Sequence, residues 1–470
     1  MDDYCGVAWF AQASGGTVVN GLDGAFGRVE TDSRSAGPHA LFVALKGERT
    51  DGHDYAAQAA ASKAAAILVS QSFWDYRGRL DPAFAHVPVI AVPDTLPALQ
   101  AAARAWRMQF PSLLRVGVTG SSGKTTLKEM IASVVARTRS VIRNPGNLNS
   151  DIGLAASIFL IRKTHEAAVF EMGINKPGEM DMLATMYEPD VAVINNIGSA
   201  HIGLLGGSRD AIAQQKKRIA SQFNGTQTLL VPEDDDYAEF LVRDIAGSVQ
   251  LFGPRSVALF EGARSLGILG WEIRYDGQLF TLSLPGAHNL KNALAAMKLA
   301  QVLDLPTSAV CDGLASVKAL PGRSQVIEGS ITVVNDCYNA NEQSTLAAME
   351  FCDQATVSGR RIYVLGSMKE LGAEGPGAHA RVGASAAHSG AALLMFYGLE
   401  AKDAYEAALA AGAKALCSYY ERYEELEAAL VKNVKPGDLV LLKASRSMAL
   451  ERVLKHIVPE AQSGGGCHVS

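Results

Sequence analysis

Cysteines are few in this sequence, and none has the spacing that a disulfide framework or a metal site requires. The 470 residues contain six cysteines and no C-x-x-C pair. The six are scattered along the chain as Cys5, Cys311, Cys337, Cys352, Cys417 and Cys467. This spacing argues against a disulfide-stapled fold and against a structural zinc site. We expect reduced, small, half-buried thiols.

The sequence also lacks long apolar runs and a strong charge of one sign. No apolar run reaches the roughly 18 residues of a membrane-spanning helix. The start, Met1-Asp2-Asp3-Tyr4, lacks the basic region of a secretory signal. A net charge of −5 gives no reason to expect nucleic acid or an acidic membrane surface as a partner. We therefore expect a cytoplasmic protein without membrane insertion. A monomer is the default expectation, which these features do not decide.

The composition is that of a globular protein with more than one hydrophobic core. Hydrophobic residues make up 48% of the chain and charged residues 19%. A chain of 470 residues is too long for a single core. Three prolines near position 94 and the run Leu320-Pro321-Gly322-Arg323 interrupt the regular patterns. We expect three domains, over residues 1–94, 95–319 and 320–470.

Apolar β-rich runs alternate with helical patterns through all three segments. This alternation predicts an α/β fold: a small N-terminal α/β domain, a central parallel-sheet domain and a C-terminal Rossmann-like domain. The expected strands are 41–45, 67–70, 87–92, 114–119, 167–170, 191–195, 228–231, 331–334, 361–365, 392–396 and 439–442. The expected helices are 55–66, 96–108, 125–136, 210–223 and 290–303. The tail from Ser463 onward is typical of a flexible end.

A glycine-rich loop between strand 114–119 and helix 125–136 predicts a phosphate-binding site. Its residues are Gly120, Ser121, Ser122, Gly123, Lys124, Thr125 and Thr126. The glycines let backbone N–H groups turn inward, and the helix N-terminus adds its positive dipole. Lys124 places a cation against the β- and γ-phosphates, and Thr125 offers a hydroxyl to Mg²⁺. Val118 stands where the common P-loop has a glycine, so a plain strand-to-helix turn is the alternative interpretation.

Three more residues suggest chemistry beside this loop. Glu171 ends one predicted parallel strand and His201 follows another, at the sheet edge where α/β proteins bind ligands. Singly, each also fits a solvated carboxylate or a loop histidine. Lys216 lies on the apolar stripe of helix 210–223, so burial is expected to lower its pKa and to favour a neutral, nucleophilic amine. The alternative is a lysine whose stem is buried and whose ammonium reaches water.

These residues, in this order, resemble the Mur ligase family of peptidoglycan synthesis, and the resemblance covers nearly the whole chain. It starts with Thr31-Asp32-Ser33-Arg34, 41–49 and Asp51-Gly52-His53-Asp54-Tyr55. It implies that the N-terminal domain binds the UDP end of the substrate, with Ser33 and Arg34 in contact. The run 146–153 is similar to the family's G-N-x-N segment, which implies that Asn147 and Asn149 also face substrate.

The resemblance implies a metal site beside the phosphate loop. Thr125, Glu171 and His201 would bind Mg²⁺, and a carbamylated Lys216 would supply a carboxylate to a second Mg²⁺. One extra residue separates His201 from Lys216 relative to the family pattern, so Lys217 is the alternative. Lys124, Glu171, His201 and Lys216 are then the expected catalytic residues.

Further positions are carried over for ATP and for the amino acceptor. Asn289 and Asn292, in the run 288–296, would approach adenine. Arg323 would face phosphate and Asp336 ribose. The run Tyr338-Asn339-Ala340-Asn341 is similar to the family branch that adds D-alanyl-D-alanine, which implies that Tyr338, Asn339 and Asn341 contact substrate. Four positions depart from the pattern and bear on acceptor binding: Ala155, Glu342, Ser367 and Ala444.

The resemblance implies an ATP-dependent carboxylate–amine ligase. Such an enzyme joins D-Ala-D-Ala to UDP-N-acetylmuramoyl-tripeptide through an acyl phosphate, and releases ADP and phosphate. Its site would form when the domains close, so Arg323 and Asp336 could lie far from Lys124 in the absence of ligand. Two other classes remain. One is another ligase of similar architecture, of the UDP-muramoyl-dipeptide, folylpolyglutamate or cyanophycin type. The other is a P-loop NTPase that acts as a switch or motor.

Overall fold

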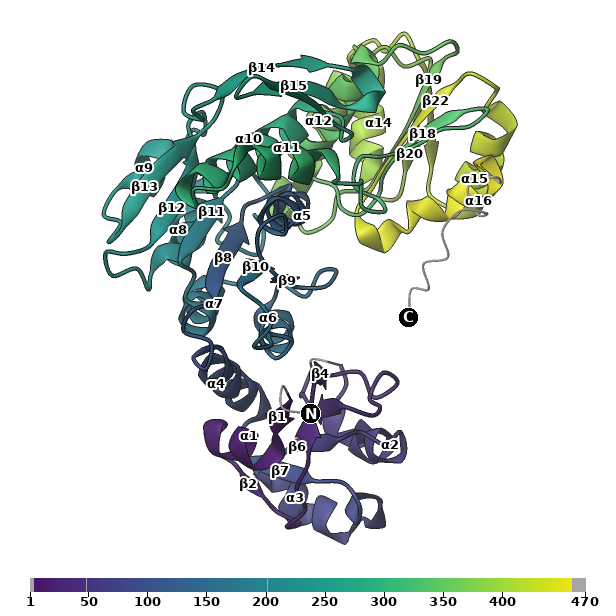
Figure 1. Cartoon of the computed structure of the whole chain (residues 1–470). Coiled ribbons are helices and arrows are strands. Elements are labelled where there is room, and N and C mark those ends of the chain that lie inside the picture. The colour runs from purple at the N-terminus through teal and green to yellow at the C-terminus, as the bar shows by residue number, and fades with distance from the viewer. Residues whose placement is uncertain (1–3, 48, 201, 459–470) are drawn as a thin grey trace.

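The structure is a computed structural model that describes residues 4–47, 49–200 and 202–458. His201, Cys467 and the tail expected to be flexible lie outside these residues, so the expectations for them rest on sequence alone. Across the described ranges, no helix is long and apolar enough to span a lipid bilayer. The chain forms three α/β units, each built on its own sheet (Figure 1). The predicted fold class is confirmed.

The N-terminal unit is built on a five-stranded sheet in the order β2-β7-β6-β5-β4. Its strands are β2 (Thr17–Val18), β4 (Arg28–Glu30), β5 (Ala40–Val43), β6 (Ala66–Ser70) and β7 (Val89–Val92). A separate antiparallel pair joins β1 (Cys5–Gly6) to β3 (Ala25–Phe26). The helices are α1 (Val7–Ala13), α2 (Ala56–Ala61) and α3 (Gln71–Tyr76). Strands β4 to β7 are parallel, and because β5 to β7 are buried on both faces they carry continuous apolar runs.

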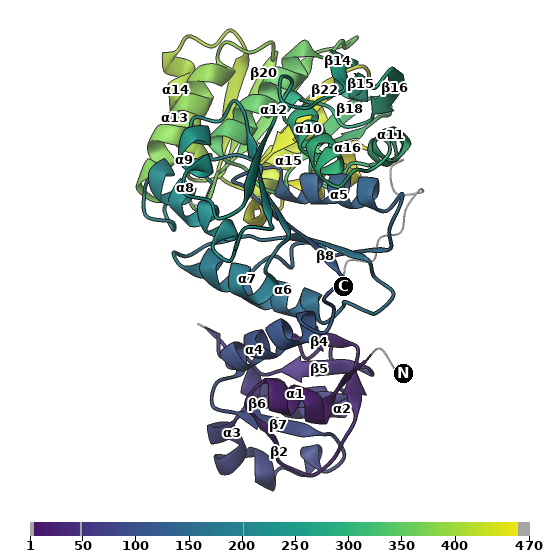
Figure 2. The same ribbon diagram turned by 60° about the vertical axis from the view of Figure 1, so that its left-hand side comes forward.

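Helix α4 (Thr95–Arg107) joins the N-terminal unit to the central one and packs against both. Leu99 and Trp106 share a hydrophobic core with Ile90 of β7 and with Phe159 of the central unit. The indole N–H of Trp106 donates to the carbonyl of Ile161 over 3.4 Å. Figure 2 shows α4 lying between the two sheets from a second direction. The connection is therefore a packed helix rather than an open linker.

The central unit is a six-stranded, fully parallel sheet in the order β13-β12-β11-β8-β10-β9. Its strands are β8 (Leu114–Thr119), β9 (Val141–Arg143), β10 (Ala167–Glu171), β11 (Val191–Ile194), β12 (Thr228–Pro232) and β13 (Ser248–Phe252). One face packs on α5 (Lys124–Val135) and α10 (Ala287–Val302), and α11 (Thr307–Ala315) packs against α5 in the same hydrophobic core. The other packs on α6 (Asp151–Ile158), α7 (Glu179–Tyr187) and α8 (Arg209–Lys217), with α9 (Ala238–Val242) beyond β12.

A three-stranded antiparallel sheet is added to the central unit, and no pattern in the sequence predicted it. It contains β14 (Phe260–Ser265), β15 (Trp271–Tyr275) and β16 (Gln278–Leu282). Ile273, Tyr275 and Leu282 join the same hydrophobic core as α10 and α11. The small sheet therefore covers helices whose outer faces would otherwise meet water.

The C-terminal unit is a second doubly wound sheet, ordered β17-β18-β22-β19-β20-β21. Its strands are β17 (Gln325–Ile327), β18 (Thr332–Asp336), β19 (Arg361–Gly366), β20 (Leu393–Tyr397), β21 (Leu416–Tyr420) and β22 (Leu439–Lys443). Its helices are α12 (Glu342–Gln354), α13 (Gly375–Ala386), α14 (Ala401–Ala410), α15 (Tyr423–Asn433) and α16 (Leu454–Ile457). Strand β17 runs antiparallel to β18, and the other described strands of this sheet pair in parallel.

Two predicted helices and four predicted thiol environments are wrong in detail. The helix expected at 55–66 is limited to α2, because Asp51 caps an earlier 3-10 turn and Lys63 adopts a left-handed backbone that stops the helix. The helix expected at 210–223 ends at Lys217, where a 3-10 turn (Arg218–Ala220) replaces its last turn. Cys5, Cys311, Cys337 and Cys352 are buried rather than half-buried, as small apolar side chains often are.

Candidate functional site

The predicted phosphate loop connects β8 to α5, and its two glycines are required by close neighbours. A Cβ at Gly120 would lie 2.9 Å from Cβ of Asn195, and one at Gly123 would lie 2.8 Å from that residue's Nδ2. Gly123 also has a left-handed backbone, with φ of +75°. The loop can therefore pass this close to the end of β11 only without side chains at these two positions.

Two asparagines after β11 hold the loop open, and neither was predicted as a site residue. Oδ1 of Asn196 accepts the backbone N–H groups of Ser121 and Ser122, over 3.1 and 2.9 Å. Nδ2 of Asn195 donates to the carbonyl of Ser122 and to Oδ1 of Asn292. These amides fix the loop's curvature relative to the central strand. Their signal in the sequence is their position at the carboxyl end of a parallel strand.

Lys124 and Lys216 meet behind the loop, at the carbonyl oxygen of Gly120. Each Nζ donates to that oxygen over 2.9 Å. Lys216 is only 2% exposed, which confirms that it lies on the buried stripe of its helix. Lys217, the alternative, instead donates to the carbonyl of Phe240 and lies over that ring.

Burial and mutual repulsion change the protonation of these two amines. Burial lowers the pKa of Lys124, while the Glu171 carboxylate opposes the shift. Burial, and then the neighbouring charge of Lys124, hold the pKa of Lys216 well below its ordinary value. Part of Lys124 faces a cavity, whereas Lys216 is enclosed by protein. Lys124 is therefore the residue placed to carry the charge, and Lys216 the one placed to be neutral.

Glu171 lies at the end of β10 with both carboxylate oxygens hydrogen-bonded. Thr125 Oγ1 donates to one over 2.5 Å, and Asn149 Nδ2 donates to the other over 2.6 Å. Asn144 fixes the backbone of Glu171 from both sides. Glu171 is 2% exposed, so these contacts orient a carboxylate that has little water around it.

The oxygens of Thr125 and Glu171 fit a magnesium ion that arrives with a triphosphate. Magnesium takes one or two protein oxygens and completes its octahedron with phosphate and water. Among the described residues, which exclude His201, no three His, Cys, Asp or Glu side chains form a metal-binding group. The protein oxygens present here would therefore depend on the nucleotide for the remaining ligands.

A cavity of about 590 Å³ connects the loop to the C-terminal unit. Its walls include most of the residues predicted for ATP and substrate. They are Ser121, Ser122, Gly123, Lys124, Thr125, Thr126, Asn147, Asn149, Glu171, Asn292, Arg323, Asp336, Tyr338, Asn339 and Asn341. Arg323 and Asp336 thus share one cavity with Lys124. The two residues do not lie far from Lys124, although the sequence left that arrangement open for the protein without ligand.

On the C-terminal side, the predicted residues are held by contacts of their own. The Arg323 guanidinium lies 3.7 Å from the centre of the Tyr338 ring. Asp336 accepts the backbone N–H of Ser324 over 2.8 Å and pairs with Lys443 over 2.7 Å. Asn341 caps α12, because its Oδ1 accepts the N–H of Ser344. Capping the helix is therefore enough to explain why Asn341 lies in the cavity wall, without any contact with substrate.

Three predicted residues of the central unit lie behind the cavity wall rather than in it. Gly120 and Lys216 meet on the inner side of the phosphate loop, as their shared hydrogen bond shows. Asn289 is buried behind Asn292, and its amide donates to the carbonyl of Pro285. These three can therefore act on a ligand in the cavity only through the residues in front of them.

Ser33 and Arg34 lie away from this cavity, in the N-terminal unit. Ser33 donates to Gln58, and Arg34 pairs with Asp32. That pairing lowers the pKa of Asp32 to about 2. Any role of Ser33 and Arg34 concerns a part of the ligand outside the cavity.

The cavity also contains charged residues that were not predicted as site residues. Asp234, Asp235 and Asp236 follow β12, and Lys443 ends β22. Their signal was again the carboxyl end of a parallel strand. Asp235 has a clear task, since Oδ2 accepts the N–H of Ile197 over 2.9 Å and so fixes the start of the loop after β11.

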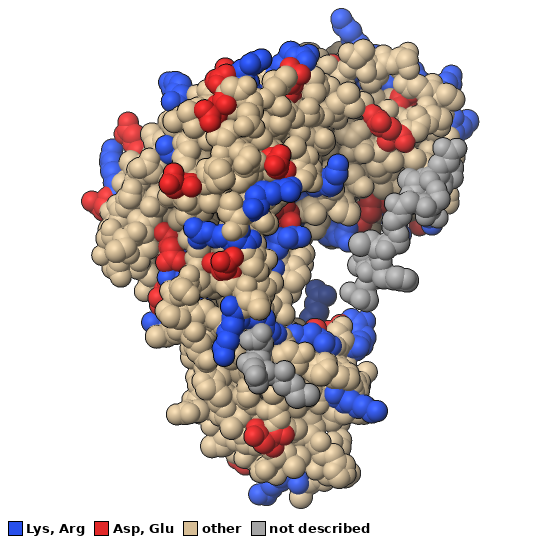
Figure 3. All heavy atoms as spheres, viewed as in Figure 1, with Lys and Arg blue, Asp and Glu red and all other residues tan. Residues whose placement is uncertain are grey.

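The surface around the units carries basic groups where the units face each other. On the face in view, Lys and Arg side chains border the hollow between the N-terminal unit and the two larger units (Figure 3). Acidic side chains are mixed among them, in keeping with the small net charge. The hollow therefore offers cations to an anionic ligand that is too long for the cavity alone.

Three family models match this chain and together cover most of it. The "Mur ligase family, catalytic domain" matches residues 26–107, and the "Mur ligase middle domain" matches 118–300. The "Mur ligase, glutamate ligase domain" matches residues 322–446. Similarity thus extends over all three units.

Proteins named UDP-N-acetylmuramoyl-tripeptide–D-alanyl-D-alanine ligase are similar over nearly the full length. The one from Treponema pallidum is 38% identical over 461 residues, covering 96% of this chain and 97% of its own. The one from Bacillus subtilis is 33% identical over 447 residues, with 94% of each chain covered.

Solved structures show the same arrangement. A crystal structure of MurF from Acinetobacter baumannii superposes with a TM-score of 0.85 at 28% identity, over 97% of this chain and 99% of its own. MurF ligase from Thermotoga maritima in complex with ADP gives a TM-score of 0.78 at 29% identity, over 93% and 98%.

Proposed function

The chain belongs to the Mur ligase family, and from that premise we propose that it joins D-alanyl-D-alanine to UDP-N-acetylmuramoyl-tripeptide at the expense of ATP. The products are ADP, phosphate and the UDP-muramoyl-pentapeptide used for peptidoglycan. ATP is an intracellular nucleotide, so the reaction is assigned to the cytoplasm. The N-terminal unit, with Ser33 and Arg34, binds the UDP end.

One observation carries this proposal. A single cavity joins the phosphate loop of the central unit to Arg323, Asp336 and the run 338–341 of the C-terminal unit. A protein that only hydrolyses a nucleotide as a switch needs the phosphate loop, but it does not need the residues of the C-terminal unit. A ligase must bring a triphosphate, a carboxylate and an amine together, and a cavity with walls from both units offers places for all three.

The reaction proceeds in two steps. The terminal carboxylate of the tripeptide bonds to the γ-phosphorus of ATP, the bond to the bridging oxygen breaks, and ADP leaves. The amine of D-Ala-D-Ala then bonds to the acyl carbon, the acyl–phosphate bond breaks, and the nitrogen loses a proton. The first step brings an anion to a polyanion, so charge neutralisation and positioning dominate.

Lys124 and Arg323 supply that neutralisation from opposite walls of the cavity. Lys124 reaches the β- and γ-phosphates from behind the loop, while the start of α5 adds partial positive charge. Arg323, stacked on Tyr338, approaches from the C-terminal unit. Asp336 receives the ribose, and Asn292 lies toward the base.

Thr125 and Glu171, with His201, are the residues proposed to hold magnesium. Bound there, magnesium would neutralise charge on the phosphate oxygens. Lys216 is proposed to react as a neutral amine with CO₂: the N–C bond forms, one C=O π bond breaks and leaves the negative charge on oxygen, and the nitrogen loses a proton to give a carbamate. Its burial and its lowered pKa support this reaction, because only the neutral amine is nucleophilic.

The proposal is tested by measuring ADP formation with UDP-muramoyl-tripeptide, with and without D-Ala-D-Ala. Turnover that requires both compounds is expected. Turnover with neither would indicate an NTPase, and turnover with L-glutamate or a diamino acid in place of D-Ala-D-Ala would indicate another ligase. Mass spectrometry of the product, expected to show addition of one D-Ala-D-Ala unit, identifies the bond formed.

A further inference from the structure

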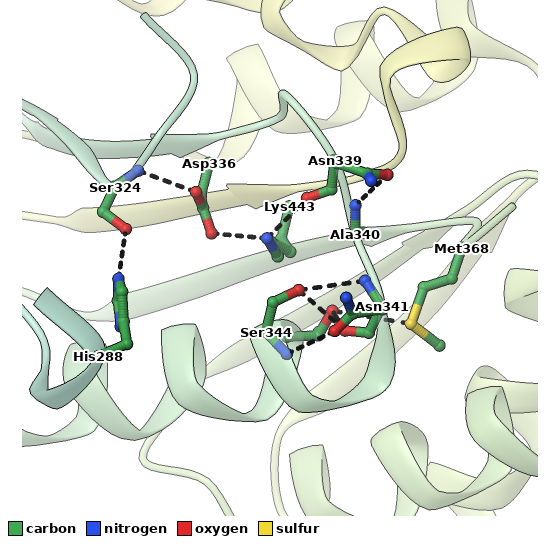
Figure 4. Close-up of polar contacts among 10 residues, drawn as sticks. His288, Ser324, Asp336, Asn339, Ala340, Asn341, Ser344, Met368 and Lys443 are labelled. Carbon is green, nitrogen blue, oxygen red and sulfur yellow. Dashed lines mark hydrogen bonds and ion pairs between the residues drawn. The ribbon is translucent and has the colours of Figure 1, made fainter. Parts of the chain in front are cut away.

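We propose that Lys443 is a positioning residue that links the nucleotide-facing Asp336 to the segment facing the amino acceptor. Lys443 binds two protein groups that lie on either side of it in the cavity wall (Figure 4). Its ammonium is thus engaged by the protein itself and acts on the ligands through those two groups. The inference rests on the proposed function for the identity of the two substrates.

The first contact is set by the sheet. Lys443 ends β22 and Asp336 ends β18, and the two residues are paired in the parallel register. Both side chains therefore emerge at the ligand-binding edge. Lys443 Nζ lies 2.7 Å from Asp336 Oδ2, and the lysine side chain is 3% exposed. A buried cation beside Asp336 keeps the local charge near zero where a triphosphate must come close.

The second contact leads to the acceptor side. The same Nζ donates to the backbone carbonyl of Asn339 over 2.8 Å. That carbonyl lies in the run 338–341, whose Tyr338, Asn339 and Asn341 line the cavity. One ammonium therefore fixes both the carboxylate at the end of β18 and the chain three residues later.

The nucleotide side of this network continues into the central unit. Asp336 Oδ1 accepts the N–H of Ser324, and the Ser324 hydroxyl lies 3.3 Å from Nε2 of His288 at the start of α10 (Figure 4). Burial lowers the pKa of His288, so this contact joins neutral groups near neutral pH. Lys443 thus anchors a chain of contacts that runs from the acceptor segment to the helix proposed to face adenine.

Removing the ammonium has two separable consequences. Asp336 becomes an uncompensated anion next to the phosphates, which weakens ATP binding by repulsion. The run 338–341 loses the side-chain hydrogen bond that it receives from β22, which weakens acceptor binding for a different reason. Neutralising Asp336 as well should relieve the repulsion that weakens ATP binding, while acceptor binding should stay weak.

The experiment compares Lys443→Met, Asp336→Asn and the double variant, with the exposed Lys432→Met as a matched control from the same unit. The KM for ATP and the KM for D-Ala-D-Ala are measured separately. For Lys443→Met both should rise by about tenfold or more, the scale of a lost hydrogen bond to a charged group. In the double variant the KM for ATP should fall well below that of Lys443→Met, because the repelling carboxylate is gone, while the KM for D-Ala-D-Ala stays high.

Two results would overturn the inference: a folded Lys443→Met enzyme with an unchanged KM for D-Ala-D-Ala, or a double variant that regains it. If Lys443→Met does not fold, the double variant carries the test alone, because it buries no unpaired charge. Failure of the proposed function is distinguishable, since the unmodified enzyme would then show no turnover that depends on D-Ala-D-Ala.

Discussion

Lys124 and Lys216 donate to one and the same acceptor, the carbonyl oxygen of Gly120, and each distance is 2.9 Å. Two ammonium groups on one carbonyl repel each other, so the protonation of one favours the neutral form of the other. Lys216 is the more deeply buried, and its pKa is held well below the ordinary value. The shared carbonyl therefore separates the two lysines into a cation that faces the cavity and a neutral amine.

Lys124→Met should nearly abolish phosphate release. Lys124 is the cation of the phosphate loop that faces the cavity, and removing one such charge-stabilising group costs about 10²–10³-fold in rate. The exposed Lys318→Met, in the same unit, should behave as the unmodified enzyme. Single-turnover phosphate release measures the effect. A Lys124→Met enzyme that keeps a rate close to normal contradicts the assignment.

Lys216→Met should be inactive and yet more stable than the unmodified protein. Because the folded-state pKa of Lys216 lies below its ordinary value of 10.5, the unfolded chain binds more protons, and stability falls as pH drops below 10.5. Each tenfold difference in proton affinity between the folded and unfolded states corresponds to about 1.4 kcal/mol. Lys216→Met has no amine at this position and does not lose this stability. The difference in Tm between the variant and the unmodified protein should therefore grow as the pH of a CO₂-free buffer is lowered from alkaline to neutral.

Bicarbonate provides the second half of this test. The unmodified enzyme, stripped of CO₂ at low pH, should regain activity when bicarbonate is added. At a fixed concentration of dissolved CO₂ it should do so faster at higher pH, because more of Lys216 is neutral. Lys216→Met should not respond. Normal activity of the variant, without any effect of bicarbonate, would show that the proposed carbamate has no role.

The sequence predicted the loop and its lysines because these features are local. Strand 114–119 was predicted with the bounds that β8 has, and the periodicity of helix 210–223 correctly placed Lys216 on a buried face. Both depend on patterns within a short stretch of chain. A buried strand, a glycine turn and a helix start determine such a site without reference to distant parts of the chain.

Contacts between distant segments could not be predicted in this way. Asn196 holds a loop 74 residues away in the chain, and Asn341 acts as a helix cap although its run resembled a substrate segment. The small sheet of β14 to β16 forms because two helices need cover, not because its strands alternate clearly. These structures depend on contacts between segments that are far apart in the chain, and the periodicity of a single sequence carries no information on such contacts.

Glu171→Gln should raise the Mg²⁺ concentration needed for half-maximal activity by about tenfold or more, because an amide oxygen is a weaker ligand than a carboxylate. The amide keeps the shape of the side chain and can still meet Thr125 and Asn149. Binding of ADP without Mg²⁺ should therefore remain close to normal. Isothermal titration with and without Mg²⁺ separates the two effects, and an unchanged Mg²⁺ requirement would remove Glu171 from the metal site.

Arg34→Met should weaken binding of the UDP substrate alone. Arg34 is exposed and paired with Asp32, so it can release that carboxylate and bind an anionic diphosphate instead. We expect the KM for UDP-muramoyl-tripeptide to rise by about tenfold, with the KM for ATP unchanged. Arg79→Met, an exposed arginine elsewhere in the N-terminal unit, is the control. Equal effects on both substrates would argue against a UDP-specific role.

Gly203→Ala should hinder the approach of the C-terminal unit to the loop after β11. A Cβ at Gly203 would lie 2.8 Å from the backbone nitrogen of Gly372 and 2.9 Å from its Cα, and backbone atoms cannot move aside as a flexible side chain can. Gly375→Ala is the matched control, because its Cβ would meet only Leu371 Cβ at an ordinary 3.9 Å.

The two alanine variants should therefore differ in kinetics and in shape. We expect Gly203→Ala to lower kcat/KM severalfold and to enlarge the radius of gyration measured by small-angle scattering with an ATP analogue. Each unit keeps its own core, so Tm should change little in either variant. Gly375→Ala should match the unmodified enzyme in both measurements. If Gly203→Ala does so too, the backbone contact between Gly203 and Gly372 does not set how closely the two units meet.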